Sequence, residues 1–242
     1  MLSLGCKKQH PSEKQQLLVF AAASLNDVFS SIAKDFEETH PDIDVQISFA
    51  GSQSLRTQIE NGAHPDVFAS ANEKHLDALV DKGLAKNKNV FALNQMVVAL
   101  YKERNPSVNR FKDLVNVKSL VLAGASVPAG AYAEDVLTKA TKTYGVQWRS
   151  DVEKKIVSRE THVRQTLQKV ILGEADAAIV YATDVASTME NLSVIGVPEA
   201  FNIRAHYPIA EISDNTNSKM FVDFLSSKIG KEKLQIHGFL LP

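Results

Sequence analysis

Leu17-Leu18-Val19-Phe20-Ala21-Ala22-Ala23-Ser24-Leu25 is the stretch that decides the fold. It opens with a run of apolar residues, a pattern that favours a short buried strand. Apolar residues then recur at helical spacing as far as Phe36, so the stretch predicts a strand that leads directly into a helix. The same unit recurs downstream, with strands expected at residues 45–49 and 67–69 and helices at 55–60 and 73–82. Alternating strands and helices indicate an α/β fold with mostly parallel sheets.

The middle of the chain repeats this theme and is interpreted as a second lobe. Helices are expected again after residue 212, where Phe221, Phe224 and Leu225 share one face and Gly230 marks a break. We expect these helices to pack back on the first lobe. No Gly/Ser-rich linker separates the parts, which favours discontinuous lobes joined by short strand crossovers. The further strands are expected at residues 96–101, 119–122, 177–181 and 207–212, and the further helices at 131–141 and 163–172.

The composition limits the classes of partner. The 242 residues include 27 Lys plus Arg and 28 Asp plus Glu, so a net charge of −1 offers no broad positive field for nucleic acid or an anionic membrane. No run approaches the roughly 18 consecutive apolar residues that a membrane-spanning helix requires. Hydrophobic residues make up 44% of the chain, which is ample for a packed core. We therefore expect a folded body with no nucleic-acid partner.

The N-terminal segment, residues 1–16, is polar and without periodicity, so we interpret it as a flexible tether. It contains the only cysteine, Cys6, which excludes an internal disulfide and any multi-thiolate metal site. Ser3-Leu4-Gly5-Cys6, followed by Lys7-Lys8-Gln9-His10, resembles the end of a bacterial lipoprotein signal, where cleavage leaves a cysteine that receives lipid. This pattern predicts lipidation at Cys6, and a free N-terminal thiol is the plainer alternative.

Polar and small residues follow the first two predicted strands. In parallel α/β sheets ligands collect at the carboxyl ends of strands, where helix N-termini present free N–H groups and a partial positive charge. Ser24 lies at the first such turn, although a serine with Asp27 three residues on is also the pattern of a helix N-cap. At the second turn, Gly51 permits close backbone approach and Ser52 offers both a hydroxyl and an N–H group.

Three further turns lie in the second part of the chain. Residues 123–130 combine small residues with Pro128, which suits a first helical turn and leaves N–H groups uncovered. Residues 160–163 begin another helix, and Tyr181, followed by Asp184, ends a strand and offers one phenolic donor. Ordinary turns would show the same residues. Together, such turns in both lobes would supply several neutral donors to one cleft, as an anion stripped of water needs.

Six motifs, spread over both lobes, are shared with one known family. They are Val19-Phe20-Ala21-Ala22-Ala23-Ser24-Leu25, Phe49-Ala50-Gly51-Ser52, Gln58-Ile59-Glu60-Asn61-Gly62-Ala63, Pro65-Asp66-Val67-Phe68-Ala69-Ser70-Ala71, Val127-Pro128-Ala129-Gly130-Ala131-Tyr132-Ala133 and Ile179-Val180-Tyr181. Through them the chain resembles the molybdate-binding receptors of bacterial ABC importers over residues 17–239. The resemblance implies a type II periplasmic-binding-protein fold, with lobe 1 at residues 17–98 plus 206–242, lobe 2 at 99–205, and crossovers near Ala99 and His206.

The resemblance also implies a site and a role. In that family two serines, backbone N–H groups and one tyrosine bind the oxyanion, and this chain has Gly51 where some members carry serine. The implied function is binding of molybdate or tungstate by lobe closure, without a cofactor or enzymatic activity. The implied setting is the periplasm or the outer face of the cell membrane, as a monomer that delivers its ligand to ABC permease subunits. The roles in binding fall on Ser24, Ser52, Ala129, Val163 and Tyr181.

Other classes of protein are weighed against this one. An α/β hydrolase would use Ser24 or Ser52 as nucleophile with a histidine such as His162, but the chain has no Gly-x-Ser-x-Gly elbow. A metal site would draw on His64, His75 and His162, whose scattered spacing favours surface histidines instead. The sensing domain of a transcription regulator would need a DNA-binding segment, which the sequence lacks.

A receptor for another solute is the serious rival, because related lobes bind sulfate, phosphate, amino acids or sugars. An amino-acid receptor is expected to place an Arg and an Asp at the ligand. The five residues assigned to the site are all uncharged, which favours an oxyanion.

Overall fold

The computed structural model describes residues 14–104, 107–186 and 192–242. Cys6, and with it the predicted lipidation site, lies outside these residues, as do residues 1–13 of the expected tether. The first strand begins at Gln15, whose backbone pairs with that of Ile43. Backbone pairing requires no apolar side chain, so the strand includes the last two residues of the segment expected to be a tether.

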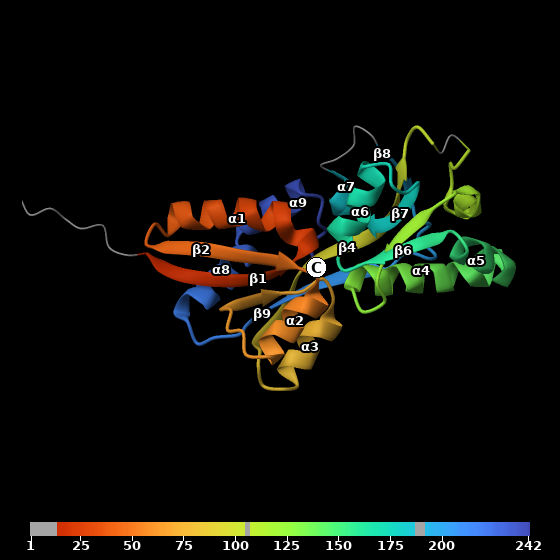
Figure 1. Cartoon of the computed structure of the whole chain (residues 1–242). Coiled ribbons are helices and arrows are strands. Elements are labelled where there is room, and N and C mark those ends of the chain that lie inside the picture. Colours follow the sequence, from red (N-terminus) through yellow and green to blue (C-terminus); the bar gives the residue numbers. More distant parts are fainter. Residues whose placement is uncertain (1–13, 105–106, 187–191) are drawn as a thin grey trace, which may run out of the picture.

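Two α/β lobes lie side by side, and two strands pass between them (Figure 1). Lobe 1 contains strands β1 (Gln15–Ala22), β2 (Ile43–Ala50), β3 (Val67–Ala69) and β9 (Arg204–Glu211), the short helix η1 (Ala23–Leu25), and helices α1 (Asn26–Thr39), α2 (Ser52–Glu60), α3 (Glu73–Val80), α8 (Thr216–Ser226) and α9 (Lys228–Ile236). Lobe 2 contains strands β5 (Leu120–Ala123), β6 (Ile156–Glu160), β7 (Ala177–Tyr181) and β8 (Leu192–Gly196), the short helix η2 (Phe111–Asn116), and helices α4 (Pro128–Tyr144), α5 (Val146–Glu153), α6 (Val163–Ile171) and α7 (Ala182–Ala186).

The strands follow the order β2-β1-β3-β9-β4-β7-β5-β6, with β8 also paired to β4. In lobe 1, β1 pairs in parallel with β2 and β3, and in lobe 2, β5 pairs in parallel with β6 and β7. The crossover strands β4 and β9 pair antiparallel with their neighbours, since one leaves lobe 1 and the other returns to it. The prediction of mostly parallel sheets is therefore wrong at the crossovers and right within each lobe.

Strand β4 (Lys86–Tyr101) is shared by both lobes. Its residues from Lys86 to Gln95 pair with β9, and those from Met96 to Tyr101 pair with β7 and β8. The strand expected at residues 96–101 is thus the second part of a longer strand, whose first four residues are polar and whose short apolar run at residues 90–93 was not assigned to a strand. The change of partner after Gln95 lies close to the lobe boundary predicted at residues 98 and 99.

The C-terminal helices pack on lobe 1, as predicted. The ring of Phe36 on α1 lies 5.3 Å from that of Phe221 and 5.4 Å from that of Phe224, centroid to centroid, in edge-on contact. The predicted break at Gly230 is wrong, because α8 ends before Ser227, whose side chain accepts a hydrogen bond from the Gly230 N–H. A Cβ atom on Gly230 would lie 2.4 Å from the Phe224 carbonyl oxygen, so glycine is needed for this close approach.

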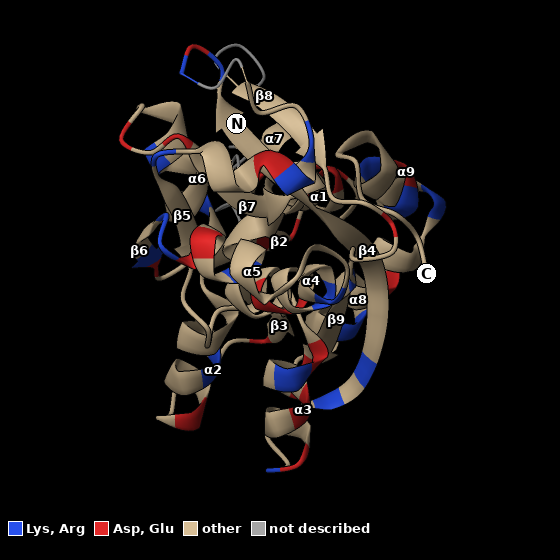
Figure 2. Cartoon of the chain, turned by 90° about the vertical axis from the view of Figure 1, so that its right-hand side faces the viewer, with Lys and Arg blue, Asp and Glu red and all other residues tan. Residues whose placement is uncertain are grey.

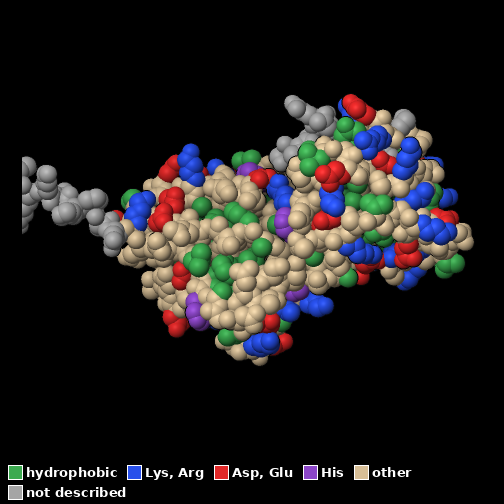
Figure 3. Space-filling model, viewed as in Figure 1, with side chains coloured by type: hydrophobic (Ala, Val, Ile, Leu, Met, Phe, Trp, Pro, Cys, Tyr) green, Lys and Arg blue, Asp and Glu red, His purple; other side chains and the backbone are tan. Residues whose placement is uncertain are grey.

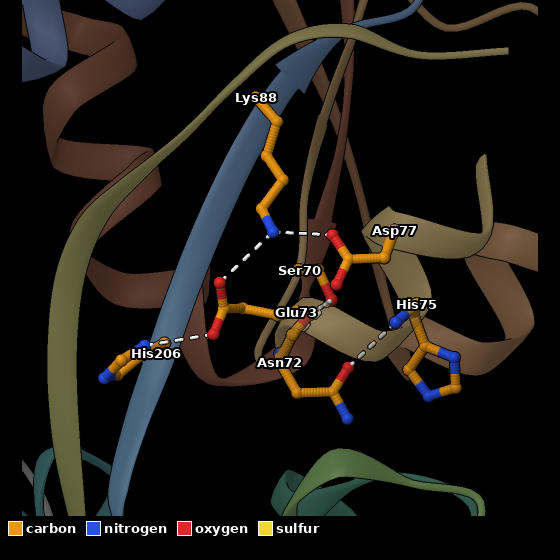
Figure 4. A network of polar contacts seen from close by, with 7 residues as sticks. All are labelled: Ser70, Asn72, Glu73, His75, Asp77, Lys88 and His206. Atoms are coloured by element: carbon orange, nitrogen blue, oxygen red, sulfur yellow. Dashed lines mark hydrogen bonds and ion pairs between the residues drawn. The ribbon is translucent and has the colours of Figure 1, made fainter. Parts of the chain in front are cut away.

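A polar network fixes α3 to both crossover strands (Figure 4). Lys88 on β4 contacts Glu73 at 3.1 Å and Asp77 at 2.5 Å, and Glu73 contacts His206 on β9 at 3.1 Å. Hydrogen bonding to Lys88 lowers the pKa of Glu73, and hydrogen bonding to Asp77 raises the pKa of Lys88. These shifts keep both partners charged, so α3 stays tied to the strands that join the lobes.

Charges are mixed over the surface. Acidic and basic residues are spread along the helices and loops of both lobes (Figure 2), and both signs are interspersed on the face drawn in Figure 3. Within residues 14–104, 107–186 and 192–242, no helix combines the length and apolar character needed to cross a membrane.

Candidate functional site

Several helices begin around one cavity between the lobes. The space measures about 210 Å³, including the part that opens to solvent. All five residues assigned to the site by the resemblance lie on its wall, and each is at most 4% exposed. The wall consists of Ala22, Ala23, Ser24, Gly51, Ser52, Ala71, Val127, Pro128, Ala129, His162, Val163 and Tyr181.

Ser24 lies in η1, directly after β1. Its side chain does not cap α1, so the interpretation as a helix N-cap is wrong. Instead, its Oγ lies 2.9 Å from the hydroxyl of Tyr207, and Asn94 Nδ2 donates to that hydroxyl at 3.4 Å. With its oxygen accepting from Asn94, Tyr207 can give its own proton to Ser24. The proton of Ser24 is then free to point at a ligand.

Ser52 is the first residue of α2, and Gly51 is its N-cap. The Ser52 Oγ accepts a hydrogen bond from the Ala71 N–H at 3.0 Å, so its proton is also available to a ligand. A Cβ atom on Gly51 would lie 2.7 Å from the Thr161 carbonyl oxygen of lobe 2. Glycine therefore permits close approach between the lobes at this turn.

Ala129 and Val163 supply backbone groups. Val127 caps α4 and Pro128 is its first residue, which leaves Ala129 at the second position. His162 caps α6 and Val163 is its first residue. N–H groups at these positions have no carbonyl partner inside their own helix and carry the positive end of the helix dipole. Both are therefore suited to receive an anion.

Tyr181 ends β7 and is buried, with 1% of its surface exposed. Its hydroxyl has no hydrogen-bond partner in the described part of the chain. The rings of Tyr132 and Tyr207 pack edge-on against it, with centroids at 6.4 Å and 5.6 Å. Burial raises the pKa of Tyr181 well above its usual value, so the phenol keeps its proton. An unpaired donor at the wall of a cavity is costly unless a ligand pairs it.

His162 also lines the cavity, although the resemblance assigned it no role. Its Nδ1 accepts a hydrogen bond from the Gln165 N–H at 3.2 Å, which places the proton of a neutral ring on Nε2. Burial lowers the pKa of His162, which favours this neutral form. No lysine or arginine is among the wall residues of the described chain, so the cavity offers uncharged donors.

Ser24, Ser52 and the histidines were also considered as catalytic or metal-binding groups. Ser24 is hydrogen-bonded to Tyr207 and Ser52 to the Ala71 N–H, and in the described part of the chain neither serine is hydrogen-bonded to a histidine. His75 is buried at 4% exposure, so its assignment to the surface is wrong. Among residues 14–104, 107–186 and 192–242, no group of three or more His, Cys, Asp or Glu side chains is arranged to hold a metal ion.

The lobes touch each other around the cavity. Gln53 Nε2 of lobe 1 donates to the Thr161 carbonyl oxygen of lobe 2 at 2.8 Å, and His75 Nε2 lies 2.9 Å from the Ser126 carbonyl oxygen. Burial lowers the pKa of His75, which favours a neutral ring that donates through Nε2. These contacts describe a closed arrangement of the lobes.

Two α/β lobes joined by crossover strands, with helix N-termini around a cavity between them, define the class of bilobal solute-binding proteins. The chain belongs to the bacterial extracellular solute-binding protein family, whose profile matches residues 17–240.

Named relatives agree with this family. The molybdate-binding protein ModA of Haemophilus influenzae is 34% identical over 234 residues, covering 93% of this chain and 89% of the relative. ModA of Mycobacterium tuberculosis is 32% identical over 233 residues, covering 94% of this chain and 85% of the relative. The structure of the periplasmic molybdate-binding protein of Azotobacter vinelandii superposes with a TM-score of 0.81 at 21% identity, over 93% of this chain and 99% of that one. This last likeness shows that the fold is shared.

Proposed function

We propose that this protein binds molybdate outside the cytoplasm and delivers it to the permease of an ABC importer. The observation that carries the proposal is the convergence of five uncharged donors from both lobes on one cavity: the hydroxyls of Ser24, Ser52 and Tyr181 and the N–H groups of Ala129 and Val163. The two ModA relatives, which are named for molybdate binding, support the choice of ligand.

Neutral donors suit a dianion that must later be released. Hydrogen bonds to charged groups contribute about 1.5–3 kcal/mol each, so five of them together offset much of the cost of removing the anion from water. A wall without cationic side chains leaves no charge unpaired after the ligand departs. Opening of the lobes therefore carries a small electrostatic cost.

Cavity size and donor chemistry set the selectivity. Molybdate and tungstate have longer bonds to oxygen than sulfate or phosphate, so the smaller anions would leave donors unpaired when the donors are held by backbone and helix ends. A donor-only wall also disfavours protonated phosphate, whose hydroxyl needs an acceptor. Because molybdate and tungstate share size and charge, we propose tungstate as a second ligand.

The setting follows from the family and from the N-terminal sequence. Membership of a bacterial extracellular family supports a location outside the cytoplasm for the folded body. We propose that Cys6 carries a lipid that holds the protein at the membrane, and that a monomer presents its closed lobes to the permease subunits. Neither a cofactor nor an enzymatic reaction is part of this proposal.

Thermal unfolding of anion-stripped protein tests the ligand. At a thousandfold excess over Kd, molybdate or tungstate should stabilise the fold by about 4 kcal/mol, which corresponds to a rise in Tm of roughly 8–16 °C for a chain of this size. Sulfate, phosphate and thiosulfate should leave Tm almost unchanged. Ser52→Ala combined with Tyr181→Phe should reduce the molybdate shift, because two donors are lost.

The alternatives give different outcomes in the same measurement. A shift with sulfate alone would point to the receptor of another oxyanion. If no oxyanion moves the midpoint, the ligand is wrong while the fold stands, and the cavity should be screened against organic solutes.

A further inference from the structure

A charged bridge crosses the cleft beside the cavity. Arg164 follows Val163 in the first turn of α6, and its Nη2 lies 2.7 Å from Asp27 Oδ2 in the first turn of α1. Its Nε lies 3.2 Å from Asp184 Oδ1 on α7. Asp27 belongs to lobe 1, whereas Arg164 and Asp184 belong to lobe 2. One guanidinium thus contacts a carboxylate in each lobe.

Asp184 connects this bridge to the wall of the cavity. It is fully buried, and its Oδ2 accepts a hydrogen bond from the Tyr181 N–H at 3.2 Å. Burial raises the pKa of Asp184 to about 7, and the charge of Arg164 acts in the opposite direction. Arg164 is therefore connected to two residues of the cavity wall. It follows Val163 directly in the chain, and its guanidinium contacts the Asp184 side chain that accepts a hydrogen bond from the Tyr181 N–H.

We infer that Arg164 is a positioning residue that latches the closed lobes through Asp27 and holds Val163 and Tyr181 in their places at the cavity. The inference rests on the proposed function, because the role of the latch is to slow the release of the bound ligand. When the lobes open, Arg164 loses Asp27 and keeps Asp184, so the latch can be undone without leaving the buried carboxylate alone.

The bridge differs from the other contacts across the cleft. Gln53 and His75 each reach one backbone carbonyl of lobe 2. The hydrogen bond from Arg164 to Asp27 is charge-assisted and therefore stronger than a neutral one, and the ion pair with Asp184 helps to keep the guanidinium in place. Arg164 is also only 26% exposed, so solvent screens it incompletely.

The test uses Asp27→Asn, because this change removes the partner across the cleft and keeps the pair within lobe 2. Asp35→Asn is the matched control. Asp35 lies on the same helix and pairs with Lys233 at 3.0 Å inside lobe 1, with 22% of its side chain exposed against 37% for Asp27. Release of ⁹⁹Mo-labelled molybdate is followed after dilution into unlabelled molybdate, and association is measured separately.

Asp27→Asn and Arg164→Met should release molybdate roughly two- to fivefold faster than the unaltered protein, with little change in the association rate. Arg164→Lys should restore part of the slow release, because a cation is kept without the two-pronged geometry. Asp35→Asn should behave like the unaltered protein. Equal release rates for Asp27→Asn and Asp35→Asn would overturn the latch.

A second measurement separates failure of the latch from failure of the proposed ligand. Spin labels at Lys34→Cys and Lys142→Cys, in a Cys6→Ser background, report the distance between lobes with and without molybdate. If Arg164 latches the lobes, the Asp27→Asn protein should show fewer short distances between the two spin labels than the parent protein, whether or not molybdate binds. Absence of binding by the parent refutes the ligand alone, and identical distance distributions in both proteins refute the latch.

Discussion

The three side-chain hydroxyls at the cavity, those of Ser24, Ser52 and Tyr181, can each donate a proton to a ligand, and the reason differs from one to the next. Ser52 accepts from the Ala71 N–H, and Ser24 is paired with Tyr207, whose oxygen already accepts from Asn94. The Tyr181 hydroxyl has no partner within the described residues. Each oxygen therefore keeps a proton that can be directed at a ligand, but only Tyr181 is left unpaired in the absence of one.

Tyr181→Phe should separate binding from stability. Loss of one hydrogen bond to a dianion should weaken molybdate binding by about 1.5–3 kcal/mol, or roughly 10- to 150-fold. The ligand-free protein should be as stable as before or slightly more so, because the change removes a buried polar atom that has no partner. Titration calorimetry and urea unfolding measure the two effects.

Tyr144→Phe is the control for this change, since Tyr144 lies in lobe 2 outside the wall of the cavity. It should leave molybdate affinity unaltered. A loss of stability in ligand-free Tyr181→Phe comparable to its loss of binding would show that the hydroxyl has a structural partner, contrary to the geometry seen here.

Sequence reasoning found the residues that lie in turns and missed those that act through distant contacts. Each of the five assigned residues lies at the end of a strand or in the first residues of a helix, so local pattern and family resemblance both reach it. The sequence indicates Tyr207 only as part of a strand, because its contact with Ser24 joins positions 183 residues apart. His162 was weighed only as a catalytic or metal-binding group, and its proton arrangement depends on the cap of α6.

At the scale of elements, the first residues of α2, α4 and α6 line the same cavity. The buried strands β1, β3, β5 and β7 were predictable from apolar runs. Strand β6 was not predicted, because none of its residues is fully buried and its pattern alternates between half-buried and exposed. The first four residues of β4 gave no signal for a similar reason, since they are polar and largely exposed, whereas the buried apolar run at residues 90–93 is short and is followed by Asn94 and Gln95.

The start of α4 depends on Gly130. A Cβ atom there would lie 2.1 Å from the Gly124 carbonyl oxygen and 2.4 Å from that of Ala123, and both are backbone atoms. Gly130→Ala should therefore destabilise the protein by about 1–3 kcal/mol despite the higher helix propensity of alanine. It should also weaken molybdate binding, because the helix end that carries the Ala129 N–H must move. Urea unfolding and calorimetry test both effects.

Gly196→Ala is the matched control for the helix start. A Cβ atom at Gly196 meets nothing within 4 Å, so this change should alter stability by no more than about 0.5 kcal/mol and leave affinity unchanged. A Gly130→Ala protein with normal stability and affinity would mean that α4 does not need its close approach to β5.

At the scale of the whole molecule, the site exists only while the lobes are together. Lobe 1 contributes two hydroxyls, and lobe 2 contributes two N–H groups and the phenol. The lobes are connected by β4 and β9, so a small change at these strands is enough to separate the two sets of donors. The Asp27–Arg164 bridge then determines how long the sets stay together.

Hydrogen exchange should report this division between the lobes. With molybdate in excess, amides in the first turns of α2, α4 and α6 should exchange more slowly, by up to roughly a thousandfold at a thousandfold excess over Kd where exchange requires ligand release. Amides of α5, which begins away from the cavity, serve as the internal control and should change little. Slowing confined to α2 would mean that the ligand is held by lobe 1 alone, whereas slowing in both lobes requires donors from each to meet the same anion.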